Sequence, residues 1–586
     1  MPSPAPSRSQ GGSIFPALVV GLGRQFRRGW TASPMYRAGL ASPKPQGLAT
    51  LPSDMRAPDL KNGQRVLDGS FVMAGGAMHL GVRGDPWDCA SPSRRFAVAL
   101  HRFGWVRDLV ALGEDGQEEA LRLTLEWRRI FGKWNTFAWA PEVLERRVFN
   151  LACSARAMCS AASEAETATI ALDLARQARH LLASDEGPLR AAERACAAAI
   201  AGTALAGDVG EALADKALQR LETALARSVA ADGGHTSRSP QAALELLLDL
   251  LTLDDALVQW GMVTPDEVMR AIDRLAGAVH FFTLTDGALP AMQGGEALNP
   301  AYVAAVGASE GTIDRASPSA RNGYQRLDGK ALQIVADADV PAAGPWSVGA
   351  CGQPLAIEVL AAGHRLIVNS GWTPDAVGPQ AVRLVDAAST ASLGDKPCGE
   401  PISGFRADVL GPRLEKAPAH VDLRRQEGER AILVELAHDG WIKPYGLTHE
   451  RRLYLDTVSD ELRGEDRFAP TGAAGGAAHR TRKFVPFTVR FHLHPDVSAL
   501  LARDKKSVLL RAGGDDAGWW LRNDAVEVVI EPSVYYQDGE ARRSNQIVLR
   551  GQVRLDTGAK IRWKLARAEA GPAPGAPPED RRQTPR

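Results

Sequence analysis

The 586-residue sequence has no excess of charge of either sign, because 69 Lys and Arg residues balance 69 Asp and Glu residues. Broad electrostatic capture of nucleic acid needs a basic excess, so we expect no nucleic-acid partner. The chain also lacks any run of about 20 apolar residues, the length that crosses a bilayer as a helix. We therefore expect no membrane span.

Cysteine is scarce and shows no motif spacing. There is no CxxC pair and no ladder typical of a disulfide-stapled secreted protein. We interpret the six cysteines as buried or free thiols in a reducing compartment: Cys89, Cys153, Cys159, Cys196, Cys351 and Cys398.

The N-terminus contains no convincing secretory signal. Its apolar run, Ile14 to Leu22, is short and contains Pro16, and the cluster of Arg24, Arg27 and Arg28 follows that run instead of preceding it. We expect a cytoplasmic location, with the periplasm as the alternative.

The periodicity of the apolar residues divides the chain in two near residue 315. From Ser93 onward they recur at helical spacing, in segments joined by short connections, which predicts serial antiparallel helices stacked as pairs. Beyond Gly311 the spacing is two, as in "VPFTVRFHLHP", which predicts two antiparallel sheets packed face to face. Residues 1–60 are expected to be an irregular lead-in, and the Pro-rich tail 568–586 is expected to be disordered.

A cluster of aromatic and basic residues occurs in "FGKWNTFAWAPEVLERRVFN". Trp134, Asn135 and Trp139 come just before a predicted helix that carries Arg146 and Arg147. Indole rings suit the faces of sugar rings, and Arg pairs with carboxylate or sulfate, so the cluster favours a sugar polymer. Core packing of the tryptophans is the alternative.

The segment "DGGHTSRSP" places His235 and Arg238 on a loop before a helix, with Ser239 and Pro240 as its predicted N-cap and first residue. A loop histidine beside a cation can act as a general base or bind an anionic sugar. An ordinary surface histidine is the alternative. The β half contains His449 and the pair His492 and His494, whose HxH spacing on a strand puts both imidazoles on one face and could bind a metal. We favour structural roles because no carboxylate partner is evident.

These segments, with others such as "HRFGWVRDLVALG" and "GLTHERRLYL", follow one another in an order that resembles the heparinase II/III-like family of polysaccharide lyases. The resemblance spans about residues 93 to 564. It implies an α+β multidomain fold, with an incomplete α/α toroid at 61–315 and a large antiparallel β-sandwich at 316–567. It also implies a substrate groove where the two meet.

The resemblance implies β-elimination on a uronate-containing acidic polysaccharide, with no cofactor and no metal required. By their motifs, His235, Arg238 and Tyr324 correspond to the catalytic group, although packing remains an alternative for Tyr324. The implied substrate-binding residues are Trp134, Asn135, Trp139, Arg147 and His449.

Several positions depart from the family pattern. Cys351 and Ser389 stand where relatives commonly carry histidines, Asn369 replaces an acidic residue, and Leu289 replaces a tyrosine. The leading interpretation is a lyase. The alternative is a catalytically inactive relative that binds or scaffolds a cell-envelope glycan. A hydrolase would need two carboxylates beside the groove, for which Glu142 and Asp232 are available.

Overall fold

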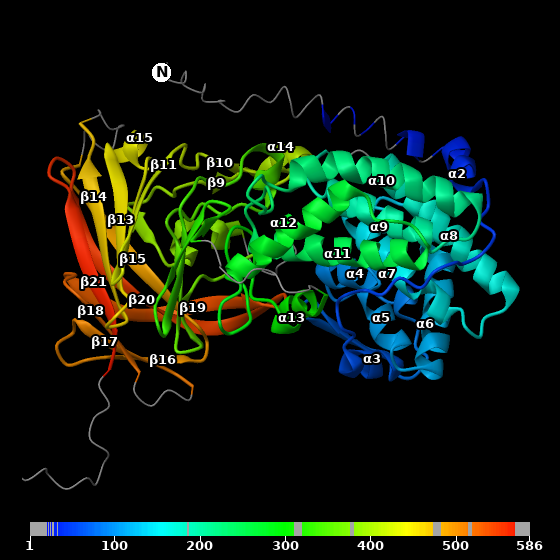
Figure 1. The fold of residues 1–586 in the computed structure, drawn as a ribbon, viewed down its shortest axis with the longest axis horizontal. Helices are drawn as coiled ribbons and strands as arrows, with labels where there is room; N and C mark the ends of the chain where they lie inside the picture. Colours follow the sequence, from blue (N-terminus) through cyan, green and yellow to red (C-terminus); the bar gives the residue numbers. More distant parts are fainter. Residues whose placement is uncertain are drawn as a thin grey trace, which may run out of the picture.

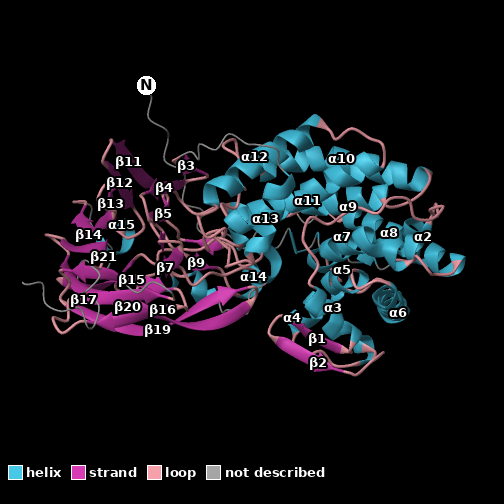
Figure 2. Ribbon diagram, turned by 60° about the horizontal axis from the view of Figure 1, so that its bottom comes forward, coloured by secondary structure: helices cyan, strands magenta, loops and turns pink. Residues whose placement is uncertain are grey.

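The computed structural model describes residues 33–184, 187–309, 319–374, 380–472, 482–513 and 518–568, together with residues 20, 21, 23, 25 and 29–31. Helices and strands separate into two halves, as Figures 1 and 2 show. The predicted division by sequence period is confirmed: the described helical layers end at Ser309 and the first strand of the large sheets begins at Ala320. The predicted boundary at residues 315 and 316 lies outside the described residues.

The helices of the first half have the following bounds: α2 Pro34–Ala41, α3 Leu60–Leu67, α4 Arg94–His101, α5 Gly104–Val110, α6 Glu114–Phe131, α7 Pro141–Met158, α8 Glu164–Ala183, α9 Ala191–Thr203, α10 Asp208–Ser228, α11 Pro240–Gln259, α12 Asp266–Phe282 and α13 Pro300–Ser309. A hairpin of β1, Ser70–Met73, and β2, Gly76–His79, packs among the first helices.

Local sequence explains where several helices start. Ser163 and Glu166 form a capping box at α8, in which each side chain bonds the other residue's backbone. At α11 the side chain of Ser239 accepts a hydrogen bond from the backbone of Ala242, and Pro240 is the first helical residue. The predicted start of this helix is therefore confirmed.

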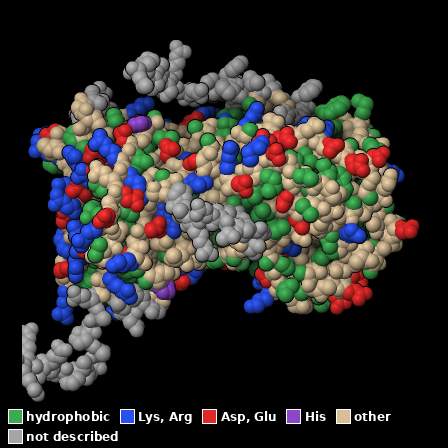
Figure 3. All heavy atoms as spheres, viewed as in Figure 1, with side chains coloured by type: hydrophobic (Ala, Val, Ile, Leu, Met, Phe, Trp, Pro, Cys, Tyr) green, Lys and Arg blue, Asp and Glu red, His purple; other side chains and the backbone are tan. Residues whose placement is uncertain are grey.

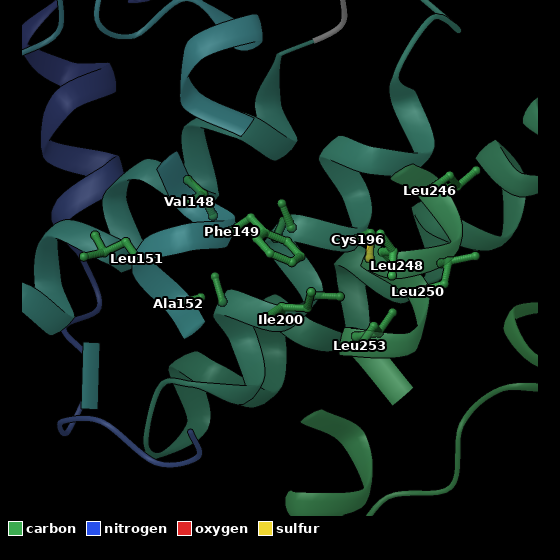
Figure 4. Close-up of a cluster of buried hydrophobic side chains, with 14 of the residues drawn as sticks. Val148, Phe149, Leu151, Ala152, Cys196, Ile200, Leu246, Leu248, Leu250 and Leu253 are labelled. Carbon is green, nitrogen blue, oxygen red and sulfur yellow. The ribbon is translucent and has the colours of Figure 1, made fainter. Parts of the chain in front are cut away.

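The helices form two layers. Helices α7, α9 and α11 pack side by side as the inner layer, and α8, α10 and α12 pack against their outer faces. Figure 4 shows the apolar side chains that the three inner helices contribute to this core, including Phe149, Ile200 and Leu253. This layering is the arrangement of an α/α toroid.

The lead-in is better packed than predicted. The segment before α3 runs along the helices, where the backbone of Ala49 donates to the carbonyl of Ala204 and the Thr50 hydroxyl donates to that of Thr203. Arg56 bridges to Asp249 of α11 at 2.7 Å. These contacts order a segment whose Pro-rich and Ser-rich composition gave no periodic signal. Of the predicted tail, only Ala568 lies within the described residues.

The second half is a sandwich of two antiparallel sheets. One sheet has eight strands in the order β11-β12-β13-β14-β21-β18-β17-β16, and the other has nine strands, eight in the order β19-β20-β15-β7-β6-β5-β4-β3 with β8 paired to β15. Their bounds are β3 Ala320–Arg321, β4 Tyr324–Asp328, β5 Leu332–Asp337, β6 Ile357–Ala361, β7 His364–Val368, β8 Ala391–Leu393, β11 Val421–Glu427, β12 Ala431–His438, β13 Leu447–Asp456, β14 Glu461–Pro470, β15 Phe484–Leu493, β16 Val497–Leu501, β17 Ser507–Ala512, β18 Trp519–Asn523, β19 Glu527–Gln537, β20 Glu540–Arg554 and β21 Ala559–Arg567.

Short elements complete the second half: α14 Gly404–Leu410, α15 Ile442–Tyr445, and the pair of β9 Glu400–Pro401 and β10 Leu414–Glu415. The alternating residues of β12 show how the sandwich core is made, because Ile432, Val434 and Leu436 are buried while their neighbours are partly exposed. Strands β19 and β20 reach the helical half, where Ala297 pairs with Gln537.

Candidate functional site

The α10–α11 connection carries two of the predicted catalytic residues to the junction of the two halves. The Arg238 guanidinium is buried there and donates hydrogen bonds across the junction to the carbonyls of Asn322, Gly323, Asp339 and Val340 and to the carboxylate of Asp337. Its distance to Asp337 is 2.5 Å. Because these acceptors occupy all three nitrogens, the guanidinium joins the halves and presents no free donor nitrogen to a substrate.

Tyr324 belongs to the same contact. It is fully buried, its hydroxyl donates to the carbonyl of Arg238 at 2.8 Å, and its ring packs against Phe282 of α12. Burial raises the pKa of this phenol well above its usual value. In this structure Tyr324 bonds and packs within the junction.

His235 is buried on the same loop. Its Nδ1 lies 2.6 Å from the hydroxyl of Ser237, and its ring meets that of Trp346 edge-on from the β half. Its Nε2 has no hydrogen-bond partner among the described residues. Burial, with the nearby charge of Arg190, lowers the pKa of this imidazole to about 3. The side chain is therefore neutral near pH 7, the form that can accept a proton.

The predicted substrate-binding residues of the α6–α7 connection differ in their exposure. Trp134 and Asn135 are half-buried, and the Asn135 side-chain oxygen accepts hydrogen bonds from the backbone of Phe137 and Ala138. Trp139 is buried and its indole donates to the carbonyl of Phe131. Of these three, Trp134 presents the partly exposed ring that a sugar could reach.

Arg147 and His449 lie in the interior of the two halves. Arg147 has no exposed surface and donates to Gln177 and to the carbonyl of His101. His449 is equally buried, and its Nε2 lies 2.9 Å from the carboxylate of Asp466. In this structure both side chains stabilise packed cores and neither lines a surface.

The four positions that depart from the family pattern are all buried, and Leu289 lines a cavity. The Asn369 side-chain oxygen accepts from the backbone of Ser389, whose hydroxyl donates to the carbonyl of Val368. The Cys351 backbone donates to the side chain of Gln293, and burial raises the pKa of its thiol. Cys351, Asn369 and Ser389 therefore bond within the fold.

A cavity of about 400 Å³ lies where the halves meet, the place at which the resemblance implies a groove, but of the residues singled out from the sequence only Leu289 and His494 line it. It lies between the α12–α13 connection and strands β7 and β19. The Tyr535 hydroxyl has no hydrogen-bond partner among the described residues, and its ring packs edge-on against His494 at 5.0 Å. Burial raises the pKa of Tyr535 and lowers that of His494.

The remaining cavity wall includes an ion pair between Arg365 and Asp286 at 2.6 Å. The sequence did not identify the residues of this cavity, because they come from segments as far apart as Asp286 and Gln537. His494 was noticed only as half of an HxH pair, and its neighbour His492 bonds instead to Ser533 and to the carbonyl of Asp386.

Within the described residues, no cluster of three or more His, Cys, Asp or Glu side chains has the geometry to hold a metal ion. The described helices include none long and apolar enough to cross a membrane. Asp232 and Glu142 are the carboxylates considered for hydrolysis. The Asp232 carboxylate accepts from the backbone of Asn322, and Glu142 is exposed at the start of α7.

An α/α toroid joined through buried contacts to an antiparallel sandwich defines a class of protein that includes polysaccharide lyases. The solved structure of heparinase III matches with a TM-score of 0.66 at 15% identity, covering 89% of this chain and 87% of that one. The heparan sulfate lyase HepC mutant from Pedobacter heparinus matches with a TM-score of 0.56 at 14% identity, covering 92% and 88%. At these identities the two structures show a shared fold.

Two sequence comparisons agree with the fold. The family model "Heparinase II/III-like, C-terminal" matches residues 314–564. "FtsZ-localized protein C" of Caulobacter vibrioides (strain NA1000 / CB15N) is 51% identical over 565 residues, which cover 96% of this chain and 98% of that protein. The chain belongs to the heparinase II/III-like family, so the predicted family and fold class are confirmed.

Proposed function

We propose that this chain binds a cell-envelope glycan without cleaving it and does so where FtsZ is located. One observation carries the first part: Arg238 and Tyr324, two of the three predicted catalytic groups, are held by each other and by the junction of the halves. A general acid or base must reach the proton that it transfers, and these groups have no free approach. The name of the Caulobacter relative supports the second part.

The end of the toroid that carries His235 is the proposed glycan surface. Consecutive helices run antiparallel, so the α6–α7, α8–α9 and α10–α11 connections lie at one end of the layers. Arg190 of the α8–α9 connection supports this arrangement, because it pairs with Glu145 near the start of α7 and approaches Glu245 near the start of α11. Trp134 supplies an aromatic ring at this end.

Binding can be tested with insoluble cell-envelope glycan in a sedimentation assay. The native chain should sediment with the glycan, and Trp134→Ala should weaken this by about tenfold, the loss expected when a ring contact of about 1.4 kcal/mol disappears. Trp260→Ala is the matched control, because Trp260 is also half-buried but follows α11 at the opposite end. Equal loss in both variants would contradict the proposed surface.

A lyase acting on uronate-containing polysaccharide is the second candidate. It is favoured by the unpartnered Nε2 of His235 and by the free hydroxyl of Tyr535 beside His494 in the junction cavity. Incubation with heparin, alginate and polygalacturonate, followed by ultraviolet absorbance of the unsaturated product, distinguishes the two candidates. Absorbance that rises with the native chain and is lost in His235→Ala or Tyr535→Phe would establish elimination and overturn the non-cleaving proposal.

The second part of the proposal, that this chain is located where FtsZ is, needs a separate test. A fluorescent fusion of the native chain should colocalise with FtsZ, and fractionation of the same cells tests the predicted cytoplasmic location. Failure of colocalisation would remove the second part of the proposal and leave the glycan assay untouched.

A further inference from the structure

Three cations stand side by side on the outer face of the eight-stranded sheet. In the strand register, Arg463 of β14 lies opposite Lys564 of β21, and Lys564 lies opposite Arg522 of β18. We call these three residues the cation row. Side chains directly opposite on one face are about 5 Å apart, and like charges at that distance destabilise a sheet.

The neighbouring row of the same face is arranged differently. There Glu435, Arg452, Glu465 and Arg562 follow one another across four strands, so that the charge alternates at each step. Arg452 pairs with Glu435 at 2.5 Å, and Arg562 pairs with Glu465 at 2.9 Å. This alternation is what a solvated sheet face needs for its own stability. The cation row lacks this alternation.

The charge of the cation row is only partly compensated. One carboxylate, that of Glu461, pairs with both Arg463 and Lys564 at 2.6 Å. Among the described residues Arg522 has no carboxylate within ion-pair distance, although Asp504 lies near enough for a Coulombic interaction with it. The ion pairs of the row therefore use one carboxylate for three cations.

A shallow groove of about 580 Å³ follows the row. Gly464 and Trp563 line its floor, and the Trp563 ring is buried in the sandwich core on the other side of the sheet. Figure 3 shows Lys and Arg side chains gathered at the sandwich end of the molecule. The groove and the charge together suit an elongated anionic ligand.

The aromatic rings beside the row favour one of two possible anions, an acidic polysaccharide or an acidic peptide. The guanidinium of Arg463 lies over the Tyr454 ring, and that of Arg522 lies over the Trp520 ring, each 5.7 Å from the centroid. A ring covered in this way offers no such face for stacking on a sugar, whereas the planar guanidinium groups still suit carboxylates. We propose that the cation row binds an acidic peptide segment of a protein partner.

The proposal stands apart from the glycan surface and does not depend on it. Arg463 and Arg522 would each take one carboxylate in a bidentate contact, and Lys564 between them would add a point charge. Neither the junction nor the end of the toroid carrying His235 contributes to this groove.

The test uses the full chain and a fluorescein-labelled peptide in which Glu alternates with Ser, with fluorescence anisotropy as the readout. Arg463→Gln, Lys564→Gln and Arg522→Gln together should weaken binding at least about tenfold, since charge-assisted hydrogen bonds are lost. Removing three charges of the same face that do not line the groove, in Arg424→Gln, Arg467→Gln and Lys560→Gln, should weaken it less than about threefold. Melting temperatures confirm that both variants fold.

Three outcomes would overturn the proposal. One is that the native chain does not bind the Glu peptide, or binds a peptide with Gln in place of Glu equally well. Another is that both triple variants lose affinity equally, which would indicate diffuse attraction. The third is that polygalacturonate binds through the cation row more tightly than the peptide, which would make the groove a glycan site.

Discussion

The Nη2 atom of Arg238 and the Oδ1 atom of Asp337 lie 2.5 Å apart and connect the helical half to the β half. Both side chains are buried. Arg238→Ala would leave the carboxylate of Asp337 buried without its cation, so we expect the free energy of unfolding to fall by about 3–5 kcal/mol. Chemical denaturation followed by circular dichroism measures this change.

The exposed ion pair of Arg270 with Glu267 is the matched control for that variant. Arg270→Ala should change the free energy of unfolding by less than about 1 kcal/mol, since exposed pairs contribute little. A similar small effect for Arg238→Ala would show that the junction contact is not a structural clamp.

Loss of the hydroxyl should destabilise the protein at one tyrosine of the junction and have little effect at another. Tyr324→Phe removes the bond to the carbonyl of Arg238 and leaves that acceptor unsatisfied, at a cost of about 1–3 kcal/mol. Tyr535→Phe removes a hydroxyl with no partner among the described residues, so the free energy of unfolding should change by less than about 0.5 kcal/mol. Thermal unfolding of both variants, measured side by side, checks the pair.

Buried histidines should make the protein less stable in mild acid. Burial lowers the pKa of His492 to about 4, below the value near 6.5 expected in the unfolded chain. The unfolded state therefore binds the proton first, and the free energy of unfolding falls as the pH decreases from about 6.5 toward 4, by up to about 1.4 kcal/mol per pH unit for this group. In His492→Gln the decrease should be shallower by that amount.

The exposed His420 provides the control for this pH series. His420→Gln should change the free energy of unfolding at neutral pH by less than about 0.5 kcal/mol, because this side chain lies on the surface. An identical slope for the native chain and His492→Gln would contradict the assignment.

Gly464 should not tolerate a side chain. A Cβ would lie 2.1 Å from the Trp563 ring, which is itself buried, so Gly464→Ala forces the ring or the strand to move. We expect a loss of about 1–3 kcal/mol in the free energy of unfolding. Gly428→Ala, where the nearest atom is 4.0 Å away, should stay within about 0.5 kcal/mol.

Periodicity was enough to predict the two halves and the start of α11, because those signals are local. The site was harder to predict. The polarity of His235 and Arg238 indicated a functional loop, but sequence does not reveal that Asn322 to Val340 would cover that loop. The same limit applies to His449, whose partner Asp466 comes from the adjacent strand.

The cation row shows the strongest dependence on long-range structure. Arg463, Arg522 and Lys564 are separated by about 40 to 60 residues each, and only the pairing of β14, β21 and β18 makes them neighbours. In the sequence each one is an ordinary charged residue of an alternating strand. A register shift of one residue would turn all of them to the other face.

The bonds that Arg238 makes have a consequence for how the protein can be divided. The helical half contributes the cation and the β half contributes every acceptor of its guanidinium, so each fragment made alone would expose half of an unsatisfied polar contact. Neither part is therefore an exchangeable module. A chimera that joins this sandwich to a foreign toroid would keep the buried carboxylate of Asp337 but lack the guanidinium that pairs with it.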